Sequence, residues 1–358
     1  MLPLFGRRWD PKDLRARVGD LAQVAGATRV VLADGSEAGV EAIDIRTGAG
    51  LRFLVLPSRG LDIADAEFEG MPLAWRSHTG RVHPAFYDPR GTGWLRGFYG
   101  GLMVTCGYLT AGVPSVDEGQ EWGQHGRASY IPAEDASVEQ GWEEGIHRIT
   151  VRGRMREAAV FGEFLVVRRT ISTALGSRSI RIEDEIENAA SQPTPLMLLY
   201  HVNLGFPLLD DGGEVLSPAR TVRPRDAAAA PGVSAYMKVH GPVRGYAEQV
   251  FYHDIEPGPD GTAEVALLNR RLRGGLALSV RYDAKALPRL VQWKMLGEGT
   301  YVMGLEPANC LVDGRAAERA RGTLQVLAPG ETRRFWIELS VATGDELPAL
   351  QSRIERSR

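Results

Sequence analysis

Apolar and polar residues alternate along much of the chain with a period of two. Successive side chains of a β-strand point to opposite faces, so this spacing indicates strands with one buried face and one exposed face. The clearest examples are Ile149 and Val151; Ile180, Ile182 and Ile186; Leu276, Leu278 and Val280; and Phe335, Ile337, Leu339 and Val341. The pattern predicts half-buried antiparallel strands in these four segments.

Turn signals separate the apolar segments at short intervals. The chain contains 42 glycines and 21 prolines, and Asp-Gly dipeptides stand at 34–35, 211–212, 260–261 and 313–314. Such dipeptides favour tight turns between strands. Strands that each bury one face are accommodated when two sheets pack together. We therefore predict a mainly β protein, in which residues 1–358 form a single large antiparallel β-sandwich with a few short peripheral helices.

Helical spacing is confined to the two ends of the chain. Asp10 and Pro11 offer an N-cap and a first-turn proline, and apolar residues follow at Leu14, Val18 and Leu21. We interpret residues 1–26 as an N-terminal helical extension. A second helix near the C-terminus is predicted from Leu347, Leu350 and Ile354. The Ala-rich stretch from Pro224 to Pro231 is predicted to be an exposed loop.

Composition and charge narrow the class of protein. The 358 residues are 44% hydrophobic and 24% charged, which is typical of a globular protein. The net charge is −3, and basic residues are scattered among acidic ones, which argues against nucleic acid and against an anionic membrane surface. Neither a signal peptide nor an apolar run of about 18 residues is found. Cys106 and Cys310 form no disulfide framework. We expect a soluble cytoplasmic protein.

Two residues have settings that suit acid/base chemistry. His201 follows an apolar run that is typical of a buried strand, and Glu306 stands among apolar residues directly before a proline. A lone histidine in such a place is often a core residue bonded to a backbone carbonyl. A buried carboxylate is either paired with an arginine or has a pKa tuned for proton transfer. Local sequence leaves both alternatives open for each residue.

Other polar residues lie in segments that resemble loops. His125 is followed by Gly126 and Arg127, which suits a loop that approaches a ligand closely or an ordinary polar turn. Arg59 and Asp62 flank Gly60, where they either form a structural ion pair or present a guanidinium to sugar hydroxyls.

Trp94 and Trp293 could act as flat platforms for a sugar ring, although aromatic residues of a β-sandwich are more often core. His78 and His83 are the histidines nearest to a metal-ligand spacing, and no carboxylate accompanies them. Motifs for phosphate binding, dinucleotide binding and activated serine nucleophiles are missing from the sequence. We expect neither a metal nor another cofactor.

Six segments, in this order, resemble the galactose mutarotase-like superfamily of aldose 1-epimerases, and more closely a divergent, uncharacterised bacterial branch of it (DUF4432-like). The segments are LPSRGLDI, GGLMVTCG, QHGRASYIPAE, IRIEDEIENAA, YHVNLGFPLL and YVMGLEPANC. The likeness extends over most of the chain. It implies a β-sandwich fold and an isomerase that acts on a carbohydrate without a cofactor.

The resemblance also implies roles for individual residues. His201 matches the general acid of these epimerases, and Glu306 matches their catalytic base. The family's substrate-binding histidine and arginine are matched by His125 and Arg59, Asn203 lies in the matched segment after His201, and Asp226 is the candidate for the sugar-binding aspartate. From their local settings, Arg127, Trp94 and Trp293 are further candidate substrate-binding residues. Tyr200 stands where the family usually has asparagine. This departure leaves the identity of the substrate open. It affects the reaction type less, because opening of a pyranose ring needs an acid and a base, and both are matched.

Three hypotheses follow from the sequence. The first is an epimerase or mutarotase that acts at the anomeric or a neighbouring carbon of a monosaccharide. The second is a protein that binds or senses carbohydrate without catalysis. The third is an oligosaccharide lyase or hydrolase, which is disfavoured because glycosidases need two carboxylates and only Glu306 stands out. The expected partner is a small-molecule carbohydrate, with a homodimer left open.

Overall fold

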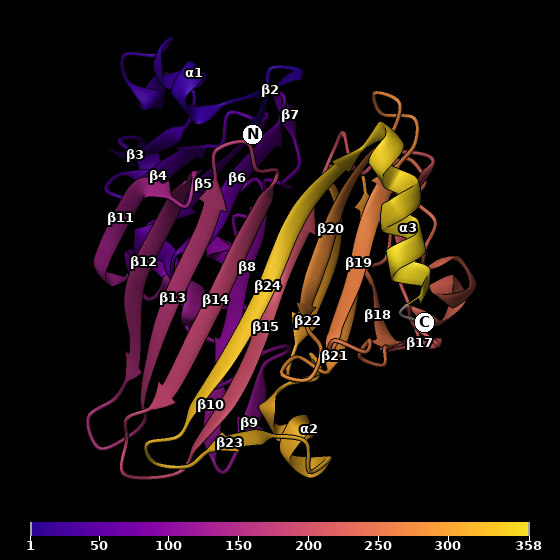
Figure 1. Ribbon diagram of the computed structural model, residues 1–358. Helices are drawn as coiled ribbons and strands as arrows, with labels where there is room; N and C mark the ends of the chain where they lie inside the picture. Colours follow the sequence, from indigo (N-terminus) through magenta and orange to yellow (C-terminus); the bar gives the residue numbers. More distant parts are fainter. Residues whose placement is uncertain (1, 357–358) are drawn as a thin grey trace.

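The computed structural model describes residues 2–356, and its two large antiparallel β-sheets pack against each other (Figure 1). This is the mainly β sandwich that the alternating pattern predicts, so the fold class is confirmed. One layer is an eight-stranded sheet. Its strands, in spatial order, are β11 (Glu134–Glu143), β12 (Ile146–Ala158), β13 (Phe164–Ala174), β14 (Ser179–Asn188), β24 (Thr332–Thr343), β20 (Leu276–Asp283), β19 (Thr262–Asn269) and β16 (Gly213–Leu216).

The other layer is a twelve-stranded sheet. Its main path runs through β17 (Thr221–Pro224), β18 (Gln249–Asp254), β21 (Arg289–Gly297), β22 (Thr300–Ala308), β15 (Thr194–Leu204), β8 (Met103–Tyr108), β6 (Asp62–Phe68), β5 (Leu51–Leu56), β4 (Glu41–Arg46) and β3 (Gly26–Val31). Two short strands lie off this path, β23 (Gln325–Leu327) beside β15 and β7 (Met71–Pro72) beside β6.

The main hydrophobic core lies between the two sheets. The four segments with the clearest alternation become β12, β14, β20 and β24, all in the eight-stranded sheet, and their apolar residues are buried. Residues from the inner face of the twelve-stranded sheet, such as Phe53 and Leu198, belong to the same cluster. The prediction of half-buried strands is confirmed for β12, β14 and β24, whereas β20 is buried on both faces over most of its length, because α3 (Leu347–Arg356) covers its outer side.

A buried ionic network joins the two sheets within this core. Arg169 on β13 binds Asp184 on the neighbouring β14 with Nε–Oδ1 and Nη2–Oδ2 distances of 2.8 and 2.6 Å. Its Nη1 donates across the core to Thr105 Oγ1 at 2.8 Å and to Asp62 Oδ1 at 3.2 Å. Tyr200 donates its hydroxyl to Asp184 at 2.7 Å. The side chains of Arg169, Asp62 and Asp184 have no exposed surface.

The outer face of the twelve-stranded sheet is covered by loops instead of a third sheet. A second apolar cluster lies there and includes Leu199 of β15 and Ala308 of β22. The short helix η5 (Gly93–Gly97) contributes Trp94 to this cluster, and Phe98 follows directly. Side chains that point outward from β15 and β22 therefore enter a layer of loop residues, which is where a ligand site can form.

The N-terminal extension differs from the predicted helix. It consists of a hairpin of β1 (Leu2–Leu4) and β2 (Arg7–Trp9), the helix α1 (Pro11–Arg15) and the turn η1 (Leu21–Gln23). Asp10 caps α1 as predicted, because its side chain accepts a hydrogen bond from the backbone N–H of Lys12. The helix ends before Gly19, a poor helix former, and Asp20 then caps the separate turn η1.

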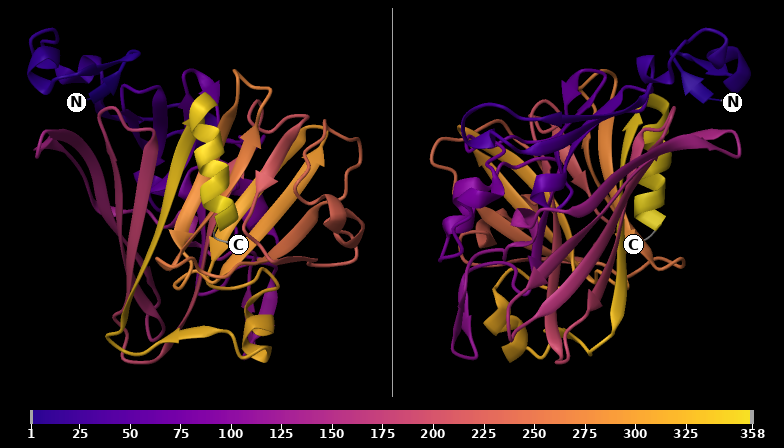
Figure 2. Two further views of the ribbon diagram at one scale, coloured as in Figure 1. Left: turned by 45° about the vertical axis from the view of Figure 1, so that its right-hand side comes forward. Right: turned by 90° about the vertical axis from the view of Figure 1, so that its left-hand side faces the viewer.

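The remaining predicted elements agree with the structure. The helix α3 (Leu347–Arg356) packs on the outer face of β19 and β20 through Leu347, Leu350 and Ile354 (Figure 2). The small elements β9 (Ser115–Asp117), β10 (Gln120–Trp122) and α2 (Arg315–Ala320) lie together at one end of the sandwich, where Arg315 and Arg319 bind Asp117. The glycines of the four Asp-Gly dipeptides all have positive φ, and three of them lie in connections between strands, whereas Gly314 is the N-cap residue of α2. The segment 224–231 is mostly exposed, apart from Ala229.

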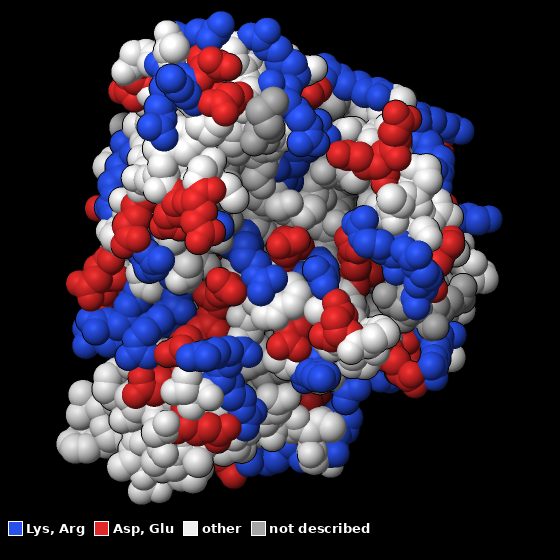
Figure 3. Space-filling model, in the orientation of Figure 1, with Lys and Arg blue, Asp and Glu red and all other residues white. Residues whose placement is uncertain are grey.

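Basic and acidic side chains are interspersed on the face seen in Figure 3. Ion pairs also join neighbouring strands, for example Arg168 of β13 with Glu187 of β14. Among residues 2–356, no helix has the length and apolar character needed to cross a bilayer.

Candidate active site

The pairing of β15 with β22 brings His201 and Glu306 together. Leu199 lies opposite Ala308 and Val202 lies opposite Leu305, so the same antiparallel register sets His201 opposite Glu306. The period of two points both side chains to the outer face, because their neighbours Tyr200 and Leu305 point into the core. The two predicted catalytic residues are thus cross-strand partners under the loop layer.

The side chains of this pair are close and almost fully buried. Nε2 of His201 lies 3.3 Å from Oε1 of Glu306, and the two side chains are 6% and 2% exposed. Glycine at position 304, two residues before Glu306 on the same face of β22, leaves room for the carboxyl group. A Cβ at Gly304 would overlap Oε1 of Glu306 and the side chain of Trp293. The purely structural alternatives do not apply. Among the described residues, no arginine forms an ion pair with Glu306, and no backbone carbonyl binds the ring of His201.

Burial moves the pKa values of the two groups in opposite directions. It raises the pKa of Glu306 well above its usual range, the charge of Glu248 adds to the rise, and Arg225 opposes it. Burial lowers the pKa of His201 well below its ordinary value, and so does a positive charge on His125. Both shifts favour neutral side chains. These shifts therefore favour a neutral imidazole beside a protonated Glu306, so the one titratable proton of the unliganded pair is on Glu306.

His125 reaches the same place from the loop between β10 and η6 (Ala128–Tyr130). Its φ is +56°, and its backbone N–H donates to the carbonyl of Gly112 at 2.9 Å. Nδ1 of His125 accepts a hydrogen bond from the N–H of Gly112 at 3.3 Å. Burial and the charge of Arg225 lower the pKa of His125 to about 4. At neutral pH the ring is therefore uncharged with its proton on Nε2, a hydrogen-bond donor.

Aromatic rings form the walls around the pair. Trp94 stacks on Phe98 with ring centroids 4.4 Å apart and lies 4.7 Å from the ring of His125. Trp293 meets the ring of His201 edge-on at a centroid distance of 5.3 Å. Both tryptophans that the sequence singled out therefore lie beside the histidines of the site.

One wall of the site is polar and is formed by Arg225 and Glu248, which the sequence did not single out. Arg225 follows β17, and its Nη2 donates to Oε1 of Glu248 at 3.1 Å. Trp293 donates its indole N–H to Oε2 of Glu248 at 2.9 Å. Asp226, the predicted sugar-binding aspartate, lies outside the cavity lining and binds Nε of Arg225 at 2.8 Å. Asp226 therefore binds Arg225, the neighbouring residue, and it is Arg225 that lines the cavity described next.

These groups enclose a cavity of about 310 Å³. Its polar lining residues are Thr92, Gln124, His125, His201, Arg225, Glu248 and Glu306, and its larger apolar ones are Trp94, Leu95, Phe98 and Trp293. A concave site with apolar walls and a few convergent polar groups is typical of small-molecule binding.

Arg59 does not reach this cavity, which corrects its prediction as a sugar ligand. It is 1% exposed and donates to the backbone carbonyls of Ser129, Val82 and Gly97. Its guanidinium also lies 4.1 Å from the centre of the Tyr130 ring. Arg59 therefore ties together the loops that cover the sheet.

Two further predicted ligands are also absent from the cavity lining. Arg127 stands at the N-cap position of η6 without a capping hydrogen bond from its side chain, and it is exposed to solvent. Asn203 is fully buried, and its amide nitrogen donates to the carbonyls of Gly101 and His201. Tyr200, the departure from the family pattern, points to the opposite face of β15 and binds Asp184.

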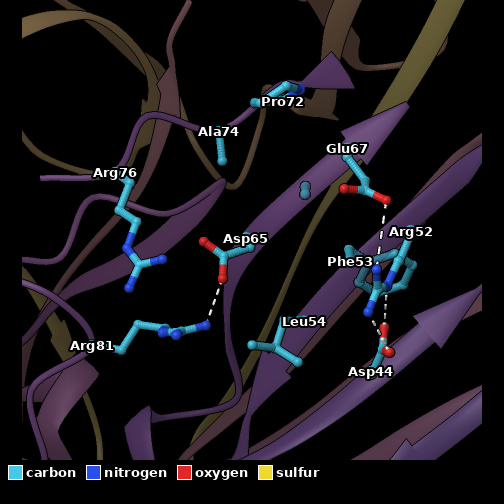
Figure 4. A pocket seen from close by; sticks show the side chains of 11 residues that line it. Asp44, Arg52, Phe53, Leu54, Asp65, Glu67, Pro72, Ala74, Arg76 and Arg81 are labelled. Carbon is cyan, nitrogen blue, oxygen red and sulfur yellow. Dashed lines mark hydrogen bonds and ion pairs between the residues drawn. The ribbon is translucent and has the colours of Figure 1, made fainter. Parts of the chain in front are cut away.

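A larger hollow of about 450 Å³ lies over β4, β5 and β6 (Figure 4). Its charged side chains pair with one another, as Arg52 does with Asp44 and Arg81 with Asp65. None of its described lining residues is a histidine. Acid/base chemistry at neutral pH is therefore better served by the smaller cavity around His201 and Glu306.

Residues 37–341 match the family model that is described as a domain of unknown function, DUF4432. The chain belongs to the DUF4432 family. No curated protein matches it. A crystal structure from Klebsiella pneumoniae, provisionally named an aldose 1-epimerase, is 26% identical, with 93% of this chain and 91% of that chain covered and a TM-score of 0.86.

More distant structures share the fold of this DUF4432 protein. A galactose mutarotase-like protein from Clostridium acetobutylicum is 11% identical, with 90% and 99% of the two chains covered and a TM-score of 0.59. A galactose 1-epimerase from Lactobacillus acidophilus is 13% identical, with 89% and 99% covered and a TM-score of 0.56. The placement that the six sequence segments suggested is confirmed by the DUF4432 match and the 26% identical structure, while these two distant structures show the shared fold.

Proposed function

We propose that this protein is a sugar epimerase of the mutarotase type, with His201 and Glu306 as its acid/base pair. The observation that carries the proposal is the 3.3 Å contact between His201 Nε2 and Glu306 Oε1 inside an aromatic-walled cavity. Two proton-transfer groups on adjacent strands can act on the same bound molecule. Similarity to proteins named as aldose 1-epimerases supports the choice of a sugar as that molecule.

Interconversion of anomers needs two proton transfers in each direction. Ring opening removes the proton of the anomeric hydroxyl and protonates the ring oxygen, which leaves an open-chain carbonyl. The carbonyl then rotates, and the ring closes on its other face as both protons return. The group at each oxygen therefore acts once as acid and once as base, and one shared proton is sufficient for the whole cycle.

The neutral pair becomes active when one proton is transferred within it. Movement of the proton from Glu306 to His201 Nε2 gives a carboxylate and an imidazolium. In this form Glu306 takes the anomeric proton and His201 protonates the ring oxygen, which are the roles that the family resemblance implies. Arg225 favours the carboxylate form, because its charge lowers the pKa of Glu306. Each group supplies roughly 10²–10⁴-fold of rate when correctly placed.

The other cavity residues suit recognition of a sugar. Trp94 and Trp293 offer apolar faces for the ring carbons, and His125 offers an N–H for a hydroxyl. A volume of about 310 Å³ lies at the small end of the range for ligand sites, which favours a monosaccharide. Glu248 is a second carboxylate, but both of its oxygens accept hydrogen bonds from Arg225 and Trp293. This engagement disfavours the two-carboxylate mechanism of a glycosidase.

The proposal is tested by anomer exchange in a panel of aldoses, ketoses and uronates, measured by saturation-transfer NMR. The protein is expected to accelerate exchange for at least one sugar, and His201→Asn is expected to abolish the acceleration. Sugar binding without faster exchange in the intact protein would instead identify a binding or sensing protein. Release of reducing ends from an oligosaccharide panel would identify a hydrolase or lyase.

The pH dependence of the exchange rate follows from the opposed pKa shifts. The pair keeps its one titratable proton over a wide pH range. The lower limit lies well below pH 6.5, because the pKa of His201 is lowered, and the upper limit lies well above pH 4.5, because the pKa of Glu306 is raised. We therefore expect kcat/KM, followed from about pH 4 to 9, to fall on the acid side as His201 gains a proton, well below pH 6.5, and on the alkaline side as Glu306 loses its proton, well above pH 4.5. An acid limb with its midpoint at or above pH 6.5 would contradict the neutral pair.

A further inference from the structure

Asn203 lies beside the catalytic pair without lining the cavity. It is two residues after His201 on β15, so both side chains leave the same face of the strand. The side chain is fully buried, with 0% of its surface exposed. A buried carboxamide is costly unless its donors and acceptor are used, so each atom of this group needs an explanation.

The orientation of the carboxamide follows from its neighbours. One terminal atom lies 3.1 Å from the carbonyl oxygen of Gly101 and 2.9 Å from the carbonyl oxygen of His201. Both neighbours are acceptors, so this atom is the nitrogen, and the reverse orientation would set three oxygens against one another. Oδ1 of Asn203 must therefore point away from the two carbonyls.

Besides Oε1 of Glu306, one buried atom each of Asn203 and His201 lacks a hydrogen-bond partner among the described residues. These atoms are Oδ1 of Asn203, an amide oxygen, which accepts, and Nδ1 of His201, a ring nitrogen, which donates in one of its two tautomers. The Asn203 side chain also opposes the fall in the pKa of His201, as an acceptor facing a ring N–H does. Hydrogen bonds of catalytic groups are often long or poorly aligned before a substrate binds, and they tighten in the complex.

We propose that Asn203 is a positioning residue that holds His201 in the tautomer with its proton on Nδ1. Oδ1 of Asn203 accepts this N–H, and the lone pair of Nε2 then faces Glu306. Nε2 becomes the one atom of the ring that exchanges protons with Glu306 and the sugar. The other tautomer would remove the Nε2 lone pair that takes the proton of Glu306, and it would turn Nδ1 into an acceptor that cannot pair with Oδ1. The catalytic consequence rests on the proposed function, whereas the tautomer does not.

The test is the protonation state of the His201 ring, read by two-bond ¹H–¹⁵N correlation in protein labelled with ¹⁵N-histidine at about pH 7. His201→Gln assigns the signals, and His253 serves as an internal reference because its Nδ1 contacts Ser217 and its Nε2 contacts Gln292, each at 2.9 Å. Wild-type His201 is expected to carry its proton on Nδ1. In Asn203→Leu the signals are expected to move toward the Nε2–H tautomer, while those of His253 stay unchanged.

A proton on Nε2 of His201 in the wild-type protein overturns the proposal, whether or not the variants fold. Unchanged His201 signals in a folded Asn203→Leu protein also overturn it. In the exchange assay, Asn203→Leu is expected to lower kcat by about 10–100-fold with little change in KM, which is the range for residues that orient metal-binding histidines. A wild-type protein with Nδ1–H but no turnover of any sugar would refute the proposed function and leave the role of Asn203 intact.

Discussion

Replacing Glu306 by glutamine is expected to lower the rate of anomer exchange by about 10²–10⁴-fold. Glutamine keeps the size and polarity of the side chain but can neither give nor accept a proton at the working pH. Because burial already raises the pKa of Glu306 and keeps it neutral, the amide should leave the unfolding free energy nearly unchanged. The measurement is the exchange rate by saturation-transfer NMR, together with a thermal unfolding curve.

Glu248→Gln is the matched control for this substitution. Glu248 lines the same cavity, but its oxygens are engaged by Arg225 and Trp293, and its side chain is 47% exposed. We expect this variant to raise KM and to change kcat by no more than a few-fold. Turnover within a few-fold of wild type in Glu306→Gln would remove Glu306 from the catalytic pair, whatever the result for Glu248→Gln.

Replacing Arg169 by leucine is expected to lower the unfolding free energy by about 3–5 kcal/mol. The side chain is fully buried and joins Asp184 of one sheet to Asp62 and Thr105 of the other. Removal of the guanidinium leaves two carboxyl groups in the core without their cation, which costs far more than the lost contacts. The measurement is the free energy of unfolding from urea titrations of both proteins.

The same variant should depend more strongly on pH than wild type. Burial outweighs Arg169 and already raises the pKa of Asp62 to about 6, and loss of the cation raises this pKa further. A carboxyl group with a raised pKa in the folded state is tolerated below its unfolded pKa and destabilises the protein as pH rises through the folded value. The deficit of Arg169→Leu is therefore expected to be smaller at about pH 5 than at about pH 8.

Arg168→Leu controls for loss of an arginine at the neighbouring position of β13. Arg168 points to solvent, is 49% exposed and pairs with Glu187 at 2.8 Å. An exposed pair of this kind contributes about 0–1 kcal/mol, so the control should unfold almost as wild type does. Equal losses in the two variants would mean that the buried network does not hold the sheets together.

Local sequence patterns predicted the strands more fully than the site. The alternation around Ile182, Val280 and Ile337 specifies buried faces, because a strand that packs on one side shows the requirement in every second residue. The local sequence around Arg59 did not predict where its side chain lies. A charged residue beside glycine suggests an exposed turn, yet three loops distant in sequence supply the carbonyls that bury its guanidinium.

The cavity contains groups for which no local signal exists. Arg225 and Glu248 come from different segments, and their contact depends on β17 and β18 lying side by side. Asn203 was predicted as a sugar ligand from its place in a family segment, whereas its burial beside His201 suggests a positioning role. Such roles depend on what fills the space around a side chain, and neighbouring residues in the sequence do not report it.

By itself, the sequence determined a two-sheet antiparallel sandwich, its family resemblance and the two residues most suited to proton transfer. Its local settings left His201 undecided between a core residue and an acid, and Glu306 between an ion pair and a base. Only the tertiary structure decided how they meet, because the antiparallel register of β15 and β22 sets two residues that are 105 positions apart in the chain opposite each other. Burial under distant loops then supplies the opposed pKa shifts, which no alternation of residues along one strand can specify.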